Sequence, residues 1–275
     1  MKILIIDRDN VASQLIGSKL KAEGHDVTQE TVKNEALERI EKGEHFDVIF
    51  VDPSPMKDAR AIVVNIRRSS HTYPYIVIMA SEDNQDIDLE KTLEMSANSF
   101  IRKPIDNLLV SDTVAQADYL KQLIERIGDE SEDFPSAGGV ISKSAFNQLF
   151  LSSLDRGSRY SELSYVLSIG IENYEEIKTM DGQYNADYVS SKLANTLVKL
   201  RRQSDIIGQT GQNEFSLLLM RTQSPNEAKD AAARFASNLE EIEDLSPSPS
   251  IAVKLYVRLT SLPNGRNTPE YLLTK

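Results

Sequence analysis

The segment that decides the fold reads FDVIFVD over residues 46–52. We interpret it as a buried strand that ends in an acid, Asp52. Residues 2–6 repeat the pattern and end at Asp7. Shorter apolar runs at 27–28, 76–79 and 99–101 predict an edge strand and two further strands, with helices over 10–24, 35–41 and 89–95. Apolar strands that alternate with helices imply a doubly wound α/β fold, a parallel sheet covered on both faces.

The bulk composition excludes several classes of protein. The chain has 275 residues, no cysteine and three histidines, which excludes disulfides and thiolate metal sites and disfavours a multi-histidine metal site. Its net charge of −11 argues against nucleic acid as a partner. The apolar start reaches Asp7 too soon for a signal peptide, and no run approaches the roughly 20 apolar residues of a membrane span. We therefore expect a cytoplasmic protein without a membrane partner.

The length favours two domains. Residues 107–127 have a helical apolar pattern, and the acidic break GDESED follows at 128–133. We expect a first domain over 1–125, an acidic linker over 126–139 and a second domain over 140–275. In the second domain the patterns predict helices at 144–154, 184–200 and 226–242. They also predict a strand at 163–171, a hairpin around Gly211 and a last strand near 251–257.

Charged residues end three of the predicted strands of the first domain. Asp7 ends the first strand, Asp52 the third and Lys103 the fifth, while Asp9 lies two residues past Asp7. Functional groups of an open parallel sheet gather at the carboxyl ends of its strands. Three carboxylates and an ammonium group there suit a hard cation and a phosphoryl group arriving on a carboxylate nucleophile.

This arrangement resembles the response-regulator receiver family over residues 1–125. The resemblance rests on IID at 5–7, VD at 51–52 and ANSFIRKP at 97–104. It implies that Asp52 accepts a phosphoryl group from a histidine kinase or phosphotransfer protein, and that Lys103 binds the phosphate. It also implies magnesium held by Asp7, Asp9, Asp52 and the main-chain carbonyl of Ser54.

Three departures from the receiver pattern bear on that site. Arg8 stands where the family has a second acid, so that either Asp9 substitutes for it or Arg8 occupies the place of the metal. The switch hydroxyl is replaced by Ala80, with Ser81 one residue late. The proline of the loop after Asp52 also comes one residue early.

The remainder of the chain resembles the GGDEF family, whose active members condense two GTP molecules into cyclic di-GMP. The likeness centres on residues 204–215, SDIIGQTGQNEF, and implies an α+β nucleotidyl-cyclase-like fold. Gly211, Glu214 and Phe215 fit the GGDEF pentad, whereas Gln212 and Asn213 do not.

Two further positions depart from the GGDEF pattern. Gly170 stands at the place of a metal-binding aspartate, and Lys178 at the place of a guanine-reading asparagine. Magnesium ions on a triphosphate need carboxylates, which Gly170 and Asn213 cannot supply. We therefore expect no catalytic residues and no enzyme activity.

One ligand motif of the family remains. Residues 202–205, RQSD, match the RxxD motif at the family spacing of six residues between Asp205 and Gly211. The resemblance implies that Arg202 and Asp205 bind cyclic di-GMP, and Arg234 on the next helix is a candidate for a second guanidinium contact.

Three functions follow from these patterns. The first is a non-catalytic two-component phosphorelay protein that binds cyclic di-GMP, with a downstream partner that the sequence does not name. The second is an active diguanylate cyclase with unusual metal ligands, and the third is a protein–protein adaptor with both sites inactive. The apolar stripe over 107–127 either forms a homodimer interface or packs on its own receiver domain.

Overall fold

The computed structural model describes residues 1–275 apart from 71, 130, 135, 137, 221, 223, 243–244, 247–249 and 263. The chain divides into two compact units, one of residues 1–122 with 156–161 and one of residues 123–155 with 162–275. Each unit contains one five-stranded sheet. The linker expected at 126–139 stays a prediction, and its residues 130, 135 and 137 lie outside the described part.

The sheet of the first unit is parallel, with the order β2-β1-β3-β4-β5. Its strands are β1 (Lys2–Ile6), β2 (Asp26–Glu30), β3 (Val48–Val51), β4 (Tyr75–Ala80) and β5 (Ser99–Arg102). All residues of β3 and β4 are buried, as is typical of a parallel sheet covered on both faces. The predicted doubly wound receiver fold and its edge strand β2 are confirmed.

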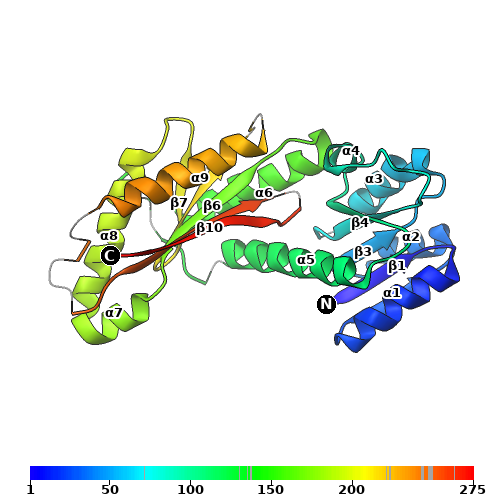
Figure 1. The fold of residues 1–275 in the computed structure, drawn as a ribbon, viewed down its shortest axis with the longest axis horizontal. Coiled ribbons are helices and arrows are strands. Elements are labelled where there is room, and N and C mark those ends of the chain that lie inside the picture. The colour runs from blue at the N-terminus through cyan, green and yellow to red at the C-terminus, as the bar shows by residue number, and fades with distance from the viewer. Residues whose placement is uncertain are drawn as a thin grey trace. The chain divides into compact units, whose positions relative to one another are not determined.

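Helices cover both faces of this sheet, and Figure 1 shows α1 and α3 on opposite sides of it. Helices α2 and α3 share a core cluster with Leu4, Ile49 and Ile76 of the strands. The helices of the unit are α1 (Asn10–Ala22), α2 (Lys33–Glu41), the 3-10 turn η1 (Met56–Asp58), α3 (Ala59–Ser69), α4 (Leu89–Glu94) and α5 (Asn107–Gly128), which continues into the second unit.

The apolar stripe of α5 is buried within the chain. Val110, Val114, Ala117 and Leu120 are at most 5% exposed. This burial favours the expectation that the stripe packs on its own domain, and a homodimer stays a prediction.

The sheet of the second unit is antiparallel, with the order β10-β9-β6-β8-β7. Its strands are β6 (Tyr165–Ile171), β7 (Ile206–Gly211), β8 (Glu214–Leu219), β9 (Lys254–Ser261) and β10 (Asn267–Thr274). Its helices are α6 (Lys143–Tyr160), α7 (Tyr174–Asp181), α8 (Gln183–Leu200) and α9 (Pro225–Glu240). Helices α7, α8 and α9 bury apolar residues in one cluster with the strands, and the expected α+β fold is confirmed.

Several local expectations need correction. Asp9 caps α1, because the Asp9 carboxylate accepts hydrogen bonds from the amides of Val11 and Ala12 at 3.0 and 3.3 Å. Helices α3 and α7 were not predicted. The strand expected to be the last, near 251–257, is β9, and β10 follows it.

Within the described residues, no helix is long and apolar enough to cross a membrane.

Candidate functional sites

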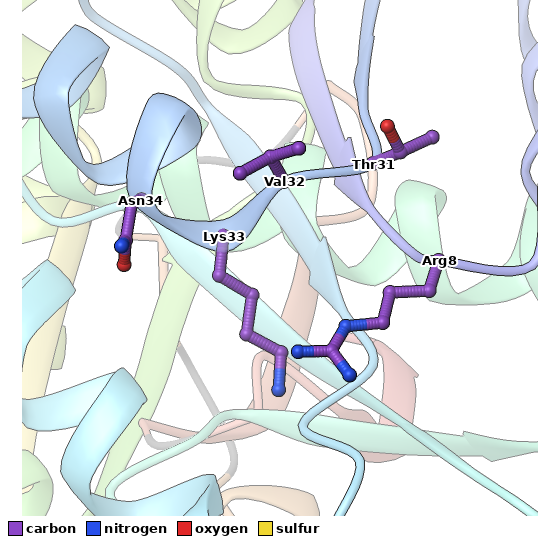
Figure 2. Close-up of a pocket in the computed structure, with 5 residues that line it drawn as sticks. All are labelled: Arg8, Thr31, Val32, Lys33 and Asn34. Atoms are coloured by element: carbon purple, nitrogen blue, oxygen red, sulfur yellow. The ribbon is translucent and has the colours of Figure 1, made fainter.

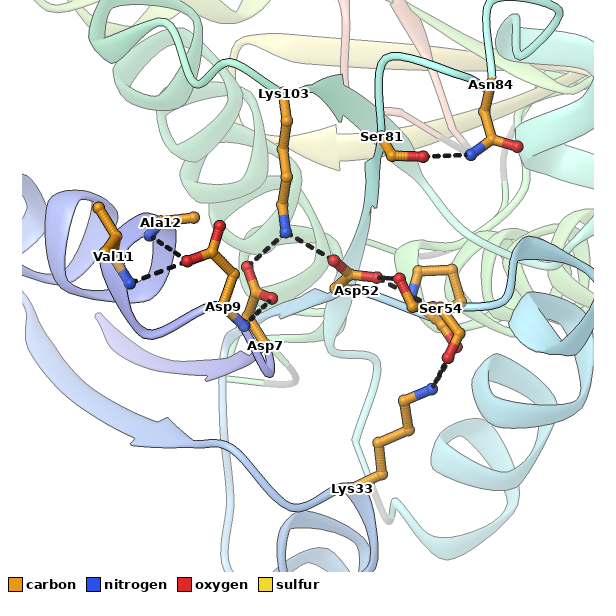
Figure 3. A network of polar contacts seen from close by, with 11 residues as sticks. Asp7, Asp9, Val11, Ala12, Lys33, Asp52, Ser54, Ser81, Asn84 and Lys103 are labelled. Carbon is orange, nitrogen blue, oxygen red and sulfur yellow. Dashed lines mark hydrogen bonds and ion pairs between the residues drawn. The ribbon is translucent and has the colours of Figure 1, made fainter.

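The ammonium group of Lys103 joins two acids at the carboxyl edge of the parallel sheet. Its Nζ lies 2.9 Å from Asp7 Oδ2 and 2.6 Å from Asp52 Oδ2 (Figure 3). Strand pairing explains this meeting, since β1, β3 and β5 all end at this edge and Asp7, Asp52 and Lys103 each follow one of them directly. The side chain of Asp7 is fully buried, and those of Asp52 and Lys103 are 12% and 17% exposed.

Asp52 is held in its ionised form. Burial disfavours its charge, but hydrogen bonds from Lys103 and Ser54 outweigh burial, so the pKa of Asp52 lies below its usual value. Ser54 contributes both its hydroxyl, at 2.5 Å, and its backbone N–H, at 2.9 Å, to Asp52 Oδ1. Burial raises the pKa of Asp7, and its bonds from Lys103 and the Asp9 amide offset only part of that effect.

The other predicted residues of this site have other partners. Asp9 serves as the helix cap described above. Ala80 is the buried last residue of β4, and Ser81 follows it with its hydroxyl accepting from Asn84 Nδ2 at 2.6 Å. Because residue 80 is an alanine, it has no hydroxyl that could contact a group on Asp52.

One of the oxygens expected to bind magnesium, the main-chain carbonyl of Ser54, contacts a lysine. Lys33 Nζ donates to the main-chain carbonyls of Pro53 and Ser54, the latter at 3.1 Å (Figure 3). Lys33 and Arg8 line a recess of about 460 Å³ together with Thr31, Val32 and Asn34, and their side chains converge in Figure 2. Burial lowers the pKa of Lys33, and the positive charge of Arg8 lowers it further. The cationic side chains of Lys33 and Arg8 do not fit a divalent cation, because they repel it and provide none of the oxygen ligands that bind it.

In the second unit, Tyr256 reaches across a glycine to an acid. Gly170 on the central strand β6 pairs with Tyr256 on β9 and with Glu214 on β8. The Tyr256 hydroxyl donates to Glu214 Oε2 at 2.6 Å, although the two residues lie on strands separated by β6. A Cβ at Gly170 would lie 2.5 Å from the Tyr256 hydroxyl oxygen. The contact therefore requires glycine at position 170.

Glu214 is buried and has partners on both oxygens. Arg126 Nη1 pairs with Oε2 at 2.5 Å, and the Thr210 hydroxyl donates to Oε1 at 2.7 Å. The Glu214 side chain is 4% exposed. Burial, followed by the negative charge of Glu214, raises the pKa of Tyr256, so the hydroxyl stays protonated and donates.

Among the described residues, no group of three or more acids or histidines is placed to hold a metal ion. Asn213 Nδ2 donates to the carbonyl of Ile171 at 2.7 Å, a bond that an aspartate could not make. A recess of about 360 Å³ beside Asn213 is lined by three glutamates, Glu172, Glu175 and Glu176. Lys178 pairs with Glu175 at 3.7 Å.

The residues of the RxxD motif share one pocket. Arg202, Asp205 and Arg234 line a cavity of about 70 Å³ with Ser204 and Glu227, among others. The Asp205 carboxylate accepts from the Arg202 backbone N–H at 2.9 Å, which leaves the Arg202 guanidinium to a 3.5 Å pair with Glu227. Arg234 Nη2 is buried and has no hydrogen-bond partner among the described residues.

Two family models match the chain. The model described as "Diguanylate cyclase, GGDEF domain" matches residues 136–275. The chain belongs to this family. The response regulator receiver domain model matches residues 3–115, so a receiver domain precedes the GGDEF domain. This combination of a receiver domain and a GGDEF domain is that of a two-component regulator of the diguanylate cyclase type.

Solved structures of both kinds are similar to parts of the chain. A response regulator receiver protein from Burkholderia phymatum has 19% identity and a TM-score of 0.37, with 42% of this chain and 93% of that chain covered. A two-component response regulator from Clostridium difficile has 24% identity and a TM-score of 0.39, covering 45% and 98%. A GGDEF domain from Pseudomonas aeruginosa has 22% identity and a TM-score of 0.38, covering 44% and 70%.

Sequence reasoning missed three residues of these sites. Lys33, Arg126 and Tyr256 lie far from the motifs in the chain, and each reaches its partner only through the fold. Of the three, only Tyr256 carried a usable signal, because an aromatic residue opposite a strand glycine is a known cross-strand pairing.

We predict that Lys103→Met lowers the free energy of unfolding of the receiver domain by about 3 kcal/mol, because it leaves the buried Asp7 without its cation. Urea unfolding followed by circular dichroism measures this. Since the pKa of Lys103 is raised, its contribution is present at neutral pH and is lost only as the pH rises above the ordinary 10.5. Lys91→Met, which removes an exposed pair with Asp86, is the matched control and should change little. Equal effects of the two variants would contradict the prediction.

Proposed function

We propose that this chain is a non-catalytic signalling protein, whose receiver domain is phosphorylated on Asp52 and whose GGDEF domain binds cyclic di-GMP without making it. The observation that carries the proposal is the Tyr256 hydroxyl bonded to Glu214 across Gly170. This contact fills the space in which the family resemblance expects a metal-binding aspartate.

The chemistry of cyclic di-GMP synthesis supports the same proposal. The reaction needs positive charge beside a triphosphate, supplied by metal ions on carboxylates. Position 170 has no side chain, and Asn213 offers the Ile171 carbonyl an N–H rather than offering a cation an oxygen. The recess beside them is lined by Glu172, Glu175 and Glu176, whose charges repel a polyphosphate.

The contacts of the RxxD pocket support cyclic di-GMP as the ligand. Arg202 is tied only loosely, since its 3.5 Å pair with Glu227 has both side chains more than 40% exposed. Such pairs contribute little and exchange readily for a phosphate. Arg234 Nη2 is a buried donor without a hydrogen bond among the described residues. The pocket has room for about two water molecules of ~30 Å³ each, so the dinucleotide would lie across its mouth.

The receiver geometry supports Asp52 as the phospho-acceptor. Its pKa lies below the usual value, so the carboxylate is ionised at neutral pH and can act as a nucleophile. One Asp52 oxygen would bond to phosphorus while the bond from phosphorus to the donor group breaks, and the donor keeps that electron pair. Lys103, 2.6 Å from Asp52, would then bind the phosphoryl oxygens. The phosphoryl group would come from a histidine kinase or phosphotransfer protein, and we place these events in the cytoplasm.

We predict that Arg202→Ala and Arg234→Ala each weaken cyclic di-GMP binding by at least about tenfold, because each removes a charge-assisted hydrogen bond. Calorimetric titration of the full chain measures this, with GTP as the competing ligand. Arg266→Ala removes the same charge from an exposed position outside the pocket and should bind like the parent. Absence of binding in the parent at high micromolar ligand would favour the adaptor function instead.

We predict no cyclic di-GMP synthesis from GTP with magnesium or manganese. Two carboxylates are missing, and each ~1.4 kcal/mol of lost transition-state stabilisation costs tenfold in rate. Chromatography of the nucleotide products, with an active diguanylate cyclase run in parallel, checks this. Steady product formation above a protein-free control would favour the diguanylate cyclase function.

We predict that a small acyl phosphate donor adds one phosphoryl group to the chain, and that Asp52→Asn abolishes this gain. Intact-protein mass spectrometry measures it. Asp58→Asn, six residues further along the chain, is the matched control and should still be labelled. A gain that persists in Asp52→Asn would place the acceptor elsewhere.

A further inference from the structure

In the receiver domain, Lys33 contacts a main-chain carbonyl that is expected to bind the metal. Its ammonium group donates to the carbonyl of Ser54 at 3.1 Å and to that of Pro53. The receiver resemblance assigns the Ser54 carbonyl to magnesium. An ammonium group at hydrogen-bond distance takes one of the two lone pairs of this oxygen, and its positive charge repels a divalent cation.

Arg8 adds a second positive charge on the same side of the site. It directly follows Asp7, at the position where the family carries an acid, and it lines the recess with Lys33 (Figure 2). The other lining residues, Thr31, Val32 and Asn34, carry no charge. A metal ion on this side of the site would therefore meet two positively charged side chains, whereas it needs carboxylates as ligands.

The acids of the site already have partners within the chain. Lys103 pairs with both Asp7 and Asp52, and Asp9 Oδ1 is engaged by two helix amides. Counted formally, the three acids are balanced by the three cations Arg8, Lys33 and Lys103. The negative charge of Asp58 also acts on Lys33. With three cations among its acids, the site has little surplus negative charge to attract a divalent cation.

We propose that the receiver site excludes divalent metal, with Lys33 on the Ser54 carbonyl and Arg8 beside it supplying the positive charge that magnesium would otherwise bring. The proposal differs from both alternatives that Arg8 left open, because the cation that contacts the Ser54 carbonyl is Lys33, and Arg8 adds its charge beside it. It holds whether or not Asp52 is phosphorylated.

Manganese binding to the full chain tests this exclusion, because free Mn²⁺ has a paramagnetic resonance signal that disappears on binding. We expect no saturable binding by the parent at millimolar Mn²⁺. Arg8→Asp combined with Lys33→Ala restores an acid and frees the carbonyl, and should bind Mn²⁺ at least about tenfold more tightly than the parent. Magnesium should compete with that binding.

Matched variants separate the site from general effects of charge. Lys42→Ala removes a lysine from the C-terminal side of α2, where it pairs with Glu38, and should leave the parent's result unchanged. Asp52→Asn added to the double variant should reduce the gained binding. The single variants Arg8→Asp and Lys33→Ala serve if the double variant fails to fold by circular dichroism. Saturable Mn²⁺ binding by the parent, or no gain in folded variants, would overturn the proposal.

Discussion

A carboxylate buried in protein must be neutralised, and both units of this chain use their own cations to do so. In the receiver domain the acid is Asp7, fully buried, and its partner is Lys103. In the GGDEF domain the acid is Glu214, and its partners are Arg126 and the hydroxyls of Tyr256 and Thr210. In both places, the family resemblance leads one to expect a metal ion nearby. The same electrostatic requirement thus explains why cationic and hydroxyl side chains gather around Asp7 and around Glu214.

The sequence predicted what depends on position along a strand. The apolar strands of the receiver are continuous runs that end in charged residues, and this pattern alone placed Asp7, Asp52 and Lys103 at one edge of the sheet. The RxxD residues and Arg234 were likewise expected together, and they line one pocket. Helix α3 was missed even though Ala59, Val63 and Ile66 have helical spacing, and β10 was missed because a proline interrupts its pattern.

What could not be predicted depends on side chains that reach across the fold. Nothing near Lys33 indicates that its ammonium group meets the loop after β3, because that contact is set by the start of α2 and by the length of the lysine. Arg126 was expected only as part of a helix end and linker, yet it pairs with an acid 88 residues further along the chain. The capping role of Asp9 was not predicted, because the apolar pattern does not fix the first residue of α1, whereas the backbone angles at the helix start do.

The row formed by Tyr256, Gly170 and Glu214 also bears on how this domain could change by mutation. A side chain introduced at position 170 collides with the tyrosine, whereas loss of the tyrosine leaves a cavity and removes a hydrogen bond from a buried acid. Each single step is therefore worse than either end state, and a return to an aspartate at this position requires at least two coordinated changes. Such a barrier holds the arrangement in place, because neither Gly170 nor Tyr256 can be exchanged alone without a loss of stability.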